Sequence, residues 1–248
     1  MPPVDDQRNY NVVKHNDLIQ RSRYNLTLQE QKIIVYLISK IQMNDTNLDL
    51  CELQIKEFCE ICGIDETSGK NYAALKQAVM ALRNKGFWVN INGEYISMSW
   101  IEKARISPKS GTIKIKLDDD MKPYLLELKE RFTSYKLYFI LAMKSKYSIR
   151  LYEILKSYQK LNQCEFEIEQ LKKLLDAETY EIFADFRVRA VDVAVKEINT
   201  YSDISVSYSL EKQGRMFHKI KFSIIPKYTL NINETTDTFK SINKIISN

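Results

Sequence analysis

The chain has 248 residues, 44% of them hydrophobic and 28% charged, and a formal net charge of +5. These values exclude a disordered or low-complexity chain and leave room for one large domain or two small ones. No apolar run approaches the roughly 20 residues of a membrane-spanning helix, and the opening MPPVDDQRNYNVVKHND lacks the apolar core of a signal peptide. We therefore expect a cytoplasmic protein that does not contact a membrane.

The first predicted elements are two helices, a short one near residues 16–23 and a longer one over residues 28–41. Thr27 opens the sequence TLQE, in which Thr27 and Glu30 can each bind the other's backbone amide as a capping box. Apolar residues repeat at helical spacing along the longer helix, at Ile34, Leu37, Ile38 and Ile41. That helix should lie in the core.

A helix-turn-helix is predicted next, after a possible β-strand at residues 48–53. Residues 56–62 suit a short helix, the turn-rich GIDETSG follows, and residues 70–85 suit a longer helix that Gly86 should cap. The buried stripe of the longer helix should be Tyr72, Leu75, Val79 and Leu82. A short helix, a glycine turn and a long helix in this order are typical of a helix-turn-helix.

Two of the four cysteines, Cys59 and Cys62, form a CxxC pair on the short helix. A structural zinc site normally needs four Cys or His ligands in paired spacing. The chain has neither a second pair nor a histidine near the first. We therefore expect two core cysteines, no bound metal and no cofactor.

Two β-hairpins should follow. Residues 87–91 and 95–100 flank an Asn92–Gly93 turn, and residues 101–106 and 112–117 flank the sequence PKSG. Residues 119–132 are then predicted to form a helix. The acidic residues Asp118–Asp120 lie at its start, where negative charge interacts favourably with the helix dipole. This interaction explains the cluster better than metal binding does.

A basic helix, KSKYSIRLYEILKSY, is predicted at residues 144–158. Residues 135–160 carry six basic side chains against one acid, an excess that equals the net charge of the whole chain. A concentrated basic face attracts phosphates, and such binding weakens as salt rises. The stripe of Tyr147, Leu151, Ile154 and Tyr158 has helical spacing and indicates core packing, not base stacking.

A two-faced helix, DFRVRAVDVAVKEIN, is predicted at residues 185–199. Its apolar face is Phe186, Ala190, Val191, Ala194, Val195 and Ile198. Two β-rich runs follow at residues 204–208 and 217–225, joined by the turn KQGR. Helices followed by a hairpin with a cationic tip form the order of a winged helix, and the first half of the chain has the same order.

We therefore predict an α+β protein with two tandem winged-helix domains, each a helix-turn-helix followed by a β-hairpin wing. The N-terminal domain should cover residues 1–132, and the C-terminal domain should cover residues 133–227. Residues 228–248 are polar, and we expect them to form a tail.

Catalytic chemistry finds little support in the residues. His15 and His218 are the only histidines, and neither belongs to a metal-binding or nucleophilic motif. The chain contains no phosphate-binding glycine loop, and a tyrosine nuclease would need a histidine pair that is absent. We therefore do not expect an enzyme.

Double-stranded DNA is the expected partner, because the second helix of a helix-turn-helix enters the major groove. In the first half the contacts should be Lys70, Asn71, Lys76, Gln77 and Arg83, with Lys109 and Ser110 in the wing. In the second half they should be Arg187, Arg189, Asp192 and Lys196, with Lys212 and Arg215 in the wing. The basic face of the preceding helix adds Lys146 and Arg150 as side chains that attract phosphates. Arginine suits guanine because its planar fork matches two acceptors.

The two later helices, KSKYSIRLYEILKSY and DFRVRAVDVAVKEIN, closely resemble those of the iteron-binding plasmid replication initiators, a family with two winged-helix domains. Residues 9–41 resemble the first helices of that family, and residues 111–137 resemble its domain junction. The resemblance covers most of the chain, whereas residues 227–248 have no clear counterpart.

The resemblance implies a protein that binds direct repeats at a replication origin as a monomer, with its domains in successive major grooves. It also implies opening of an adjacent A·T-rich segment, recruitment of the host initiator and helicase, and autorepression by a dimer on an inverted repeat. In such proteins the dimer forms mainly through the N-terminal domain, which also binds DNA, and the C-terminal domain is the main reader of DNA sequence. Arg187, Arg189 and Lys196 would be base or phosphate contacts, and Arg150 would face the DNA backbone or support the helix. A winged-helix transcriptional regulator of one palindrome is the alternative.

Overall fold

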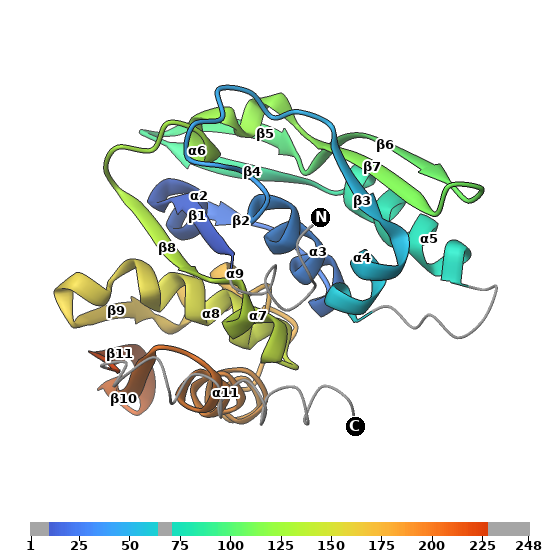
Figure 1. The fold of residues 1–248 in the computed structure, drawn as a ribbon. Coiled ribbons are helices and arrows are strands. Elements are labelled where there is room, and N and C mark those ends of the chain that lie inside the picture. Colours follow the sequence, from blue (N-terminus) through green and yellow to red (C-terminus); the bar gives the residue numbers. More distant parts are fainter. Residues whose placement is uncertain (1–9, 64–70, 228–248) are drawn as a thin grey trace. The chain divides into compact units, whose positions relative to one another are not determined.

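The computed structural model describes residues 10–63 and 71–227, which divide into two compact units (Figure 1). The first unit runs to Leu141 and includes Lys173–Asp176, and the second contains the other described residues. Our expectations for Lys70, for the glycine-rich turn after Gly63 and for the tail from residue 228 lie outside the described residues.

The boundary between the units falls later than residue 132, where we had expected it. The strand β8 (Phe132–Lys136) pairs antiparallel with β1 (Asn11–His15), so that Val13 lies opposite Ser134. Because this pairing ties β8 to the start of the chain, β8 belongs to the first unit.

The helices and strands of the first unit after β1 are, in chain order, α2 (Asn16–Arg21), β2 (Ser22–Arg23), α3 (Leu28–Ile38), β3 (Cys51–Gln54), α4 (Ile55–Cys62), α5 (Asn71–Asn84), β4 (Gly86–Ile91), β5 (Glu94–Ser99), β6 (Ile101–Ser107), β7 (Thr112–Leu117), the 3-10 turn η1 (Asp119–Met121), α6 (Lys122–Leu125), β8 and α7 (Leu137–Ala142). The second unit contains α8 (Lys146–Ser157), the 3-10 turn η2 (Gln159–Leu161), β9 (Gln163–Glu167), α9 (Ile168–Leu174), α10 (Phe183–Phe186), the π-helical turn η3 (Arg187–Asp192), α11 (Val193–Tyr201), β10 (Ile204–Gln213) and β11 (Met216–Pro226).

The two units repeat one topology. In the first, β3 precedes the helix pair α4 and α5 and then pairs with β7, the second strand of the β6–β7 hairpin. In the second, β9 precedes α9 and the helix of α10, η3 and α11, and pairs with β11 of the β10–β11 hairpin. A helix, a strand, two helices and a hairpin therefore occur twice in the same order. The first unit adds a β2–β4–β5 sheet.

Helix α3 begins at the predicted capping box. The Thr27 hydroxyl accepts from the Glu30 amide at 3.2 Å, and the Glu30 carboxylate accepts from the Thr27 amide at 2.8 Å. The helix ends at Ile38, earlier than predicted. The same carboxylate is buried and accepts from Lys85 Nζ at 2.6 Å, which links α3 to the residue after α5.

The two helices of the predicted helix-turn-helix form in the first unit, with one correction. Gly63 caps α4 in the left-handed conformation, at φ 67°, and Leu75, Val79 and Leu82 of α5 are buried. Gly86 was wrongly predicted as the cap of α5. It opens β4, where a Cβ would lie 3.3 Å from the Met98 carbonyl, because β4 and β5 pair closely at this point.

The prediction of a long helix at residues 119–132 is wrong. Only η1 and α6 form, and the chain is extended at Leu126 and left-handed at Glu127 and Arg131. Tertiary pairing overrides the helical pattern here, because the chain must turn back to place β8 beside β1. At the acidic start of this segment, the Asp118 carboxylate caps η1 by accepting from the Asp120 amide.

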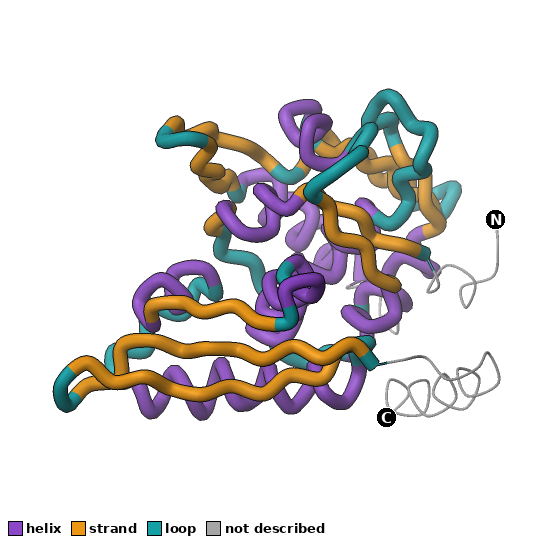
Figure 2. Tube along the Cα trace, turned by 90° about the vertical axis from the view of Figure 1, so that its left-hand side faces the viewer, coloured by secondary structure: helices purple, strands orange, loops and turns teal. Residues whose placement is uncertain are grey.

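The core of the second unit lies between its helices and its sheet. Leu151 and Ile154 of α8, Phe186 and Ile198 of the later helix, and Phe222 of β11 are fully buried. Figure 2 shows the long strands of the β10–β11 hairpin side by side, with a helix running behind them. This arrangement exposes the tip of the hairpin and the outer face of the continuous helix formed by α10, η3 and α11.

Candidate nucleic-acid interface

One continuous helical segment of the second unit, comprising α10, η3 and α11, presents the face predicted to read DNA. Its inner face is buried through Phe186, Ala190, Val191, Ala194 and Ile198, as predicted, and Val195 is half-buried. Its outer face exposes two basic side chains, Arg189 and Lys196. We call this segment the recognition helix of the second unit.

The middle of this recognition helix is a π-helical turn. Residues five apart in an α-helix point about 140° away from each other, at 3.6 residues per turn. A π-turn pairs residues i and i+5, and here Arg187 Nε lies 3.8 Å from the Asp192 carboxylate. The wider turn therefore places these two side chains together on the outer face.

A tyrosine of the wing strand β10 contacts the same carboxylate. The Tyr208 hydroxyl donates to Asp192 Oδ1 at 2.5 Å. Burial, together with this hydrogen bond, raises the pKa of Tyr208 to about 12. The hydroxyl therefore keeps its proton at neutral pH and remains a donor.

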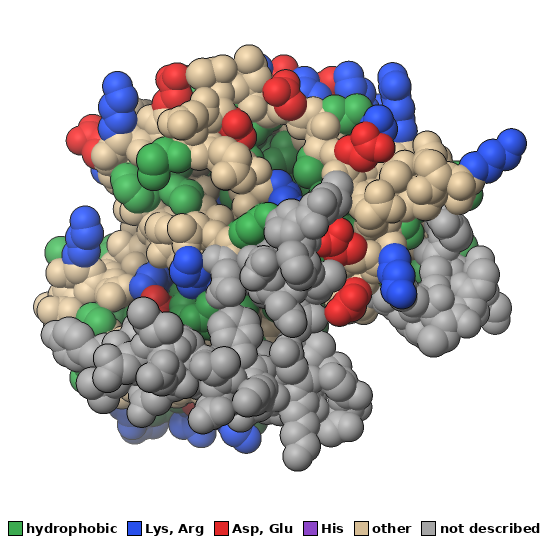
Figure 3. Space-filling view, viewed as in Figure 1, with side chains coloured by type: hydrophobic (Ala, Val, Ile, Leu, Met, Phe, Trp, Pro, Cys, Tyr) green, Lys and Arg blue, Asp and Glu red, His purple; other side chains and the backbone are tan. Residues whose placement is uncertain are grey.

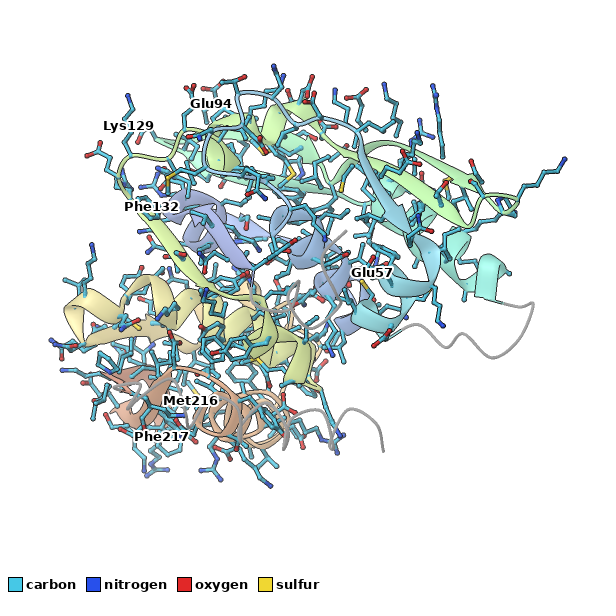
Figure 4. All side chains as sticks on the ribbon, in the orientation of Figure 1. Glu57, Glu94, Lys129, Phe132, Met216 and Phe217 are labelled. Carbon is cyan, nitrogen blue, oxygen red and sulfur yellow. The ribbon has the colours of Figure 1, made fainter. Side chains whose placement is uncertain are left out.

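The tip of the β10–β11 hairpin combines cationic and apolar side chains. Lys212 and Arg215 are exposed beside the left-handed Gly214, as expected for a wing. Lys212 Nζ lies 5.0 Å from the centre of the Phe217 ring, and that ring lies 5.1 Å from the Phe183 ring of α10. Figure 4 shows Phe217 and the exposed Met216 next to each other on this hairpin.

The start of α8 is held by the recognition helix. One Glu197 oxygen accepts from the backbone amides of Lys144 and Ser145, at 3.1 and 3.2 Å, and Ser145 caps α8 by accepting from the Tyr147 amide. Lys146, the first residue of α8, is half-buried with its Nζ 5.2 Å from the Tyr147 ring centre. These contacts set the basic start of α8 in a fixed relation to the recognition helix.

The basic region at residues 135–160 is smaller on the surface than its sequence suggests. Arg150 is only 2% exposed, so the structure contradicts a direct DNA contact by this side chain and favours a role in supporting the helices. Lys156 pairs with the Asp203 carboxylate at 2.5 Å, and the Tyr152 hydroxyl donates to the same carboxylate at 2.9 Å. These two basic groups therefore serve the interior of the unit.

In the first unit the predicted contacts lie at two places. Lys76, Gln77 and Arg83 are exposed on α5, outside its buried stripe. Lys109 and Ser110 are exposed at the β6–β7 turn. Figure 3 shows basic side chains projecting at several places on the face that it draws. Asn71 opens α5, whereas Lys70 lies outside the described residues.

Sequence reasoning missed two exposed valines and the contact of one half-buried tyrosine. Val188 and Val193 are 53% and 36% exposed on the recognition helix. The sequence did contain a sign of this exposure, because neither position belongs to the apolar stripe of the helix. Tyr208 was assigned only to a strand, and no local pattern links it to Asp192, sixteen positions away. The strand β9 and helix α9 were also not predicted.

The cysteines and acidic groups give no sign of metal chemistry in the described part of the chain. Cys59 and Cys62 are buried, as predicted for core residues, and burial raises the pKa of the Cys62 thiol strongly. Within residues 10–63 and 71–227, His, Cys, Asp and Glu side chains do not gather in threes at metal-binding distance. No helix in these ranges has the length and apolar character needed to cross a bilayer.

The repeated topology, with a recognition helix and a hairpin wing in each unit, defines a tandem winged-helix protein. Residues 11–156 match the domain described as Initiator Replication protein, WH1, and residues 167–224 match the domain described as Initiator Rep protein, WH2. The chain therefore belongs to the initiator replication protein family. The predicted fold class and the predicted family are both confirmed.

The similar proteins include two from Escherichia coli. The PI protein is 28% identical over 193 residues, which are 69% of this chain and 62% of the relative. A Replication initiation protein is 26% identical over 227 residues, which are 86% of this chain and 69% of the relative. The crystal structure of the Pi initiator protein in complex with iteron DNA has the same fold, with a TM-score of 0.70, 20% identity and coverage of 89% of this chain and 99% of that one.

Proposed function

We propose that this protein initiates plasmid DNA replication by binding direct repeats at an origin through both winged-helix domains. The single observation that carries the proposal is the match of both initiator domains along one chain, each with an exposed basic helix and a wing. The relation to the Pi initiator, whose structure holds iteron DNA, supports the same partner for this chain.

The exposed residues fall into two groups according to the DNA contacts that they would make. Lysines and arginines in the wings and at the start of α8 would bind phosphates and set the register on the duplex. The recognition helices would select the sequence, α5 with Lys76, Gln77 and Arg83, and the helix of the second unit with Arg187, Arg189 and Lys196. Asn71 would join the α5 contacts.

Origin opening would follow from binding at several repeats. Bending a site costs a few kcal/mol, which contacts from the second domain would offset. The strained DNA would favour opening of an adjacent A·T-rich segment, where the host initiator and helicase would be recruited. As a dimer the protein would repress its own gene, and it would catalyse no reaction itself.

A footprint on the DNA that flanks the gene, taken at two salt concentrations, tests this proposal. We expect evenly spaced protection of several direct repeats, weaker at the higher salt because counterions compete for phosphates. A single protected palindrome at the promoter would instead identify a winged-helix transcriptional regulator. Absence of protection at both concentrations would overturn DNA binding itself.

A further inference from the structure

The contact of Arg187, Asp192 and Tyr208 joins the recognition helix of the second unit to its wing. Asp192 stands between the other two, with one carboxylate oxygen 2.5 Å from the Tyr208 hydroxyl and the other 3.8 Å from Arg187 Nε. The Arg187 side chain is 41% exposed, but Nε itself is enclosed and makes no hydrogen bond within the described residues. The guanidinium therefore has its inner edge toward Asp192 and its outer part toward solvent.

The backbone around this contact is tied at a second point. Asn199 of α11 donates to the Val206 carbonyl at 2.9 Å and accepts from the Val206 amide at 2.6 Å. Val206 and Tyr208 are two positions apart on β10, so their side chains point to the same face of the sheet. The strand therefore has a fixed register against the helix, and Tyr208 meets Asp192 in that register.

The nearest comparable arginine has no such support. Arg189 Nε lies 3.7 Å from the Asp185 carboxylate, but these side chains are 68% and 51% exposed, and the pair is an ordinary i,i+4 surface contact. Exposed pairs of this kind contribute little and are not held in one geometry. The pair of Arg187 differs because its carboxylate is also bonded to Tyr208 and because Arg187 Nε is enclosed, so Arg187 is the better-oriented of the two arginines.

We propose that Tyr208 and Asp192 are positioning residues that hold Arg187 for bidentate recognition of one guanine in the repeat. A guanidinium offers a rigid planar fork, and orienting it before binding reduces the ordering that association would otherwise require. A side chain of the wing would thereby determine the base specificity of the recognition helix. This inference rests on the proposed binding of origin repeats.

Competition binding with a panel of repeats, each carrying one base-pair change, tests the inference. Full-length protein and the variants R187A, D192N and Y208F are measured at two salt concentrations, with D185N as the matched control. Wild-type protein should lose about tenfold or more in affinity when the critical G·C pair is changed, the usual size for a good bidentate contact. R187A should lose that discrimination, Y208F and D192N should reduce it severalfold at the same position, and D185N should retain it.

The outcomes separate this inference from the function on which it rests. If wild-type protein binds no repeat, the proposed function fails. If it binds but Y208F and D192N, with wild-type thermal unfolding, discriminate as well as wild type, the positioning role is overturned. If R187A weakens every sequence equally and lowers the salt dependence, Arg187 is a phosphate contact and the inference is wrong.

Discussion

Arg187 and Arg189 are two positions apart, yet their guanidinium groups have different surroundings. Arg187 is half-buried against Asp192, whereas Arg189 extends into solvent beside Asp185. Exposed valines lie on the same helix, at positions 188 and 193. At the residue scale, the predicted interface therefore combines a half-buried cation, solvent-exposed cations and exposed apolar groups of the kind that contact thymine methyls.

Replacing both arginines by alanine should abolish specific binding and leave the fold intact, because neither side chain lies in the core. Gel-shift titrations with specific and scrambled repeats measure the loss, and thermal unfolding checks the fold. The matched control is R23A with K129A, which removes the same charge from exposed positions in the first unit, outside its wing and recognition helix (Lys129 is labelled in Figure 4). A double arginine variant with normal unfolding and normal affinity would contradict the assignment.

Tyr208 predicts a pH effect on stability. Its pKa in the folded protein, about 12, is above the ordinary value of 10 because of burial and its bond to Asp192. Folding therefore favours the protonated hydroxyl, and this contribution is present below pH 10 and is lost as pH rises toward 12. Between these values the melting temperature of wild-type protein should fall more steeply than that of Y208F. Parallel curves for the two proteins would show that Tyr208 does not contribute.

At the element scale, the capping box of α3 is the clearest local determinant of structure. Both of its hydrogen bonds form, and Glu30 also reaches Lys85 beyond α5. The prediction is that T27A lowers the free energy of unfolding by about 1 kcal/mol, because one first-turn amide loses its acceptor. Urea denaturation measures this change. T27S keeps the oxygen and should lose much less, so equal losses in the two variants would refute the capping argument.

At the scale of the whole molecule, the shared topology predicts that each unit reads a separate part of one repeat. K76A with R83A should remove contacts of α5 alone, since both side chains are exposed on that helix. The footprint should then shorten at one end of every repeat, and discrimination against base changes at that end should weaken, because these side chains are proposed to select the sequence. Uniform weakening across the whole repeat would mean that the two units do not divide the site.

Local patterns in the sequence determined much of this fold. The capping box placed the start of α3, and Asn92 and Gly93 specified a turn that needs two positive φ angles, which are 53° and 91°. The 3.6-residue repeat from Phe186 to Ile198 correctly separated the buried face of the recognition helix from its outer face. These features depend on residues close together in the chain, so the sequence reports them directly.

Contacts between distant residues decided the rest. The pairing of β8 with β1 ended the helix predicted at residues 119–132, and the packing of α8 turned Arg150 inward. The π-turn brought Arg187 to Asp192, and β10 brought Tyr208 to the same carboxylate. The sequence by itself thus determined the family, the two-domain plan and the helix faces. Only the tertiary structure decided which basic side chains reach the surface and which are oriented there, because burial and orientation depend on neighbours that no local pattern contains.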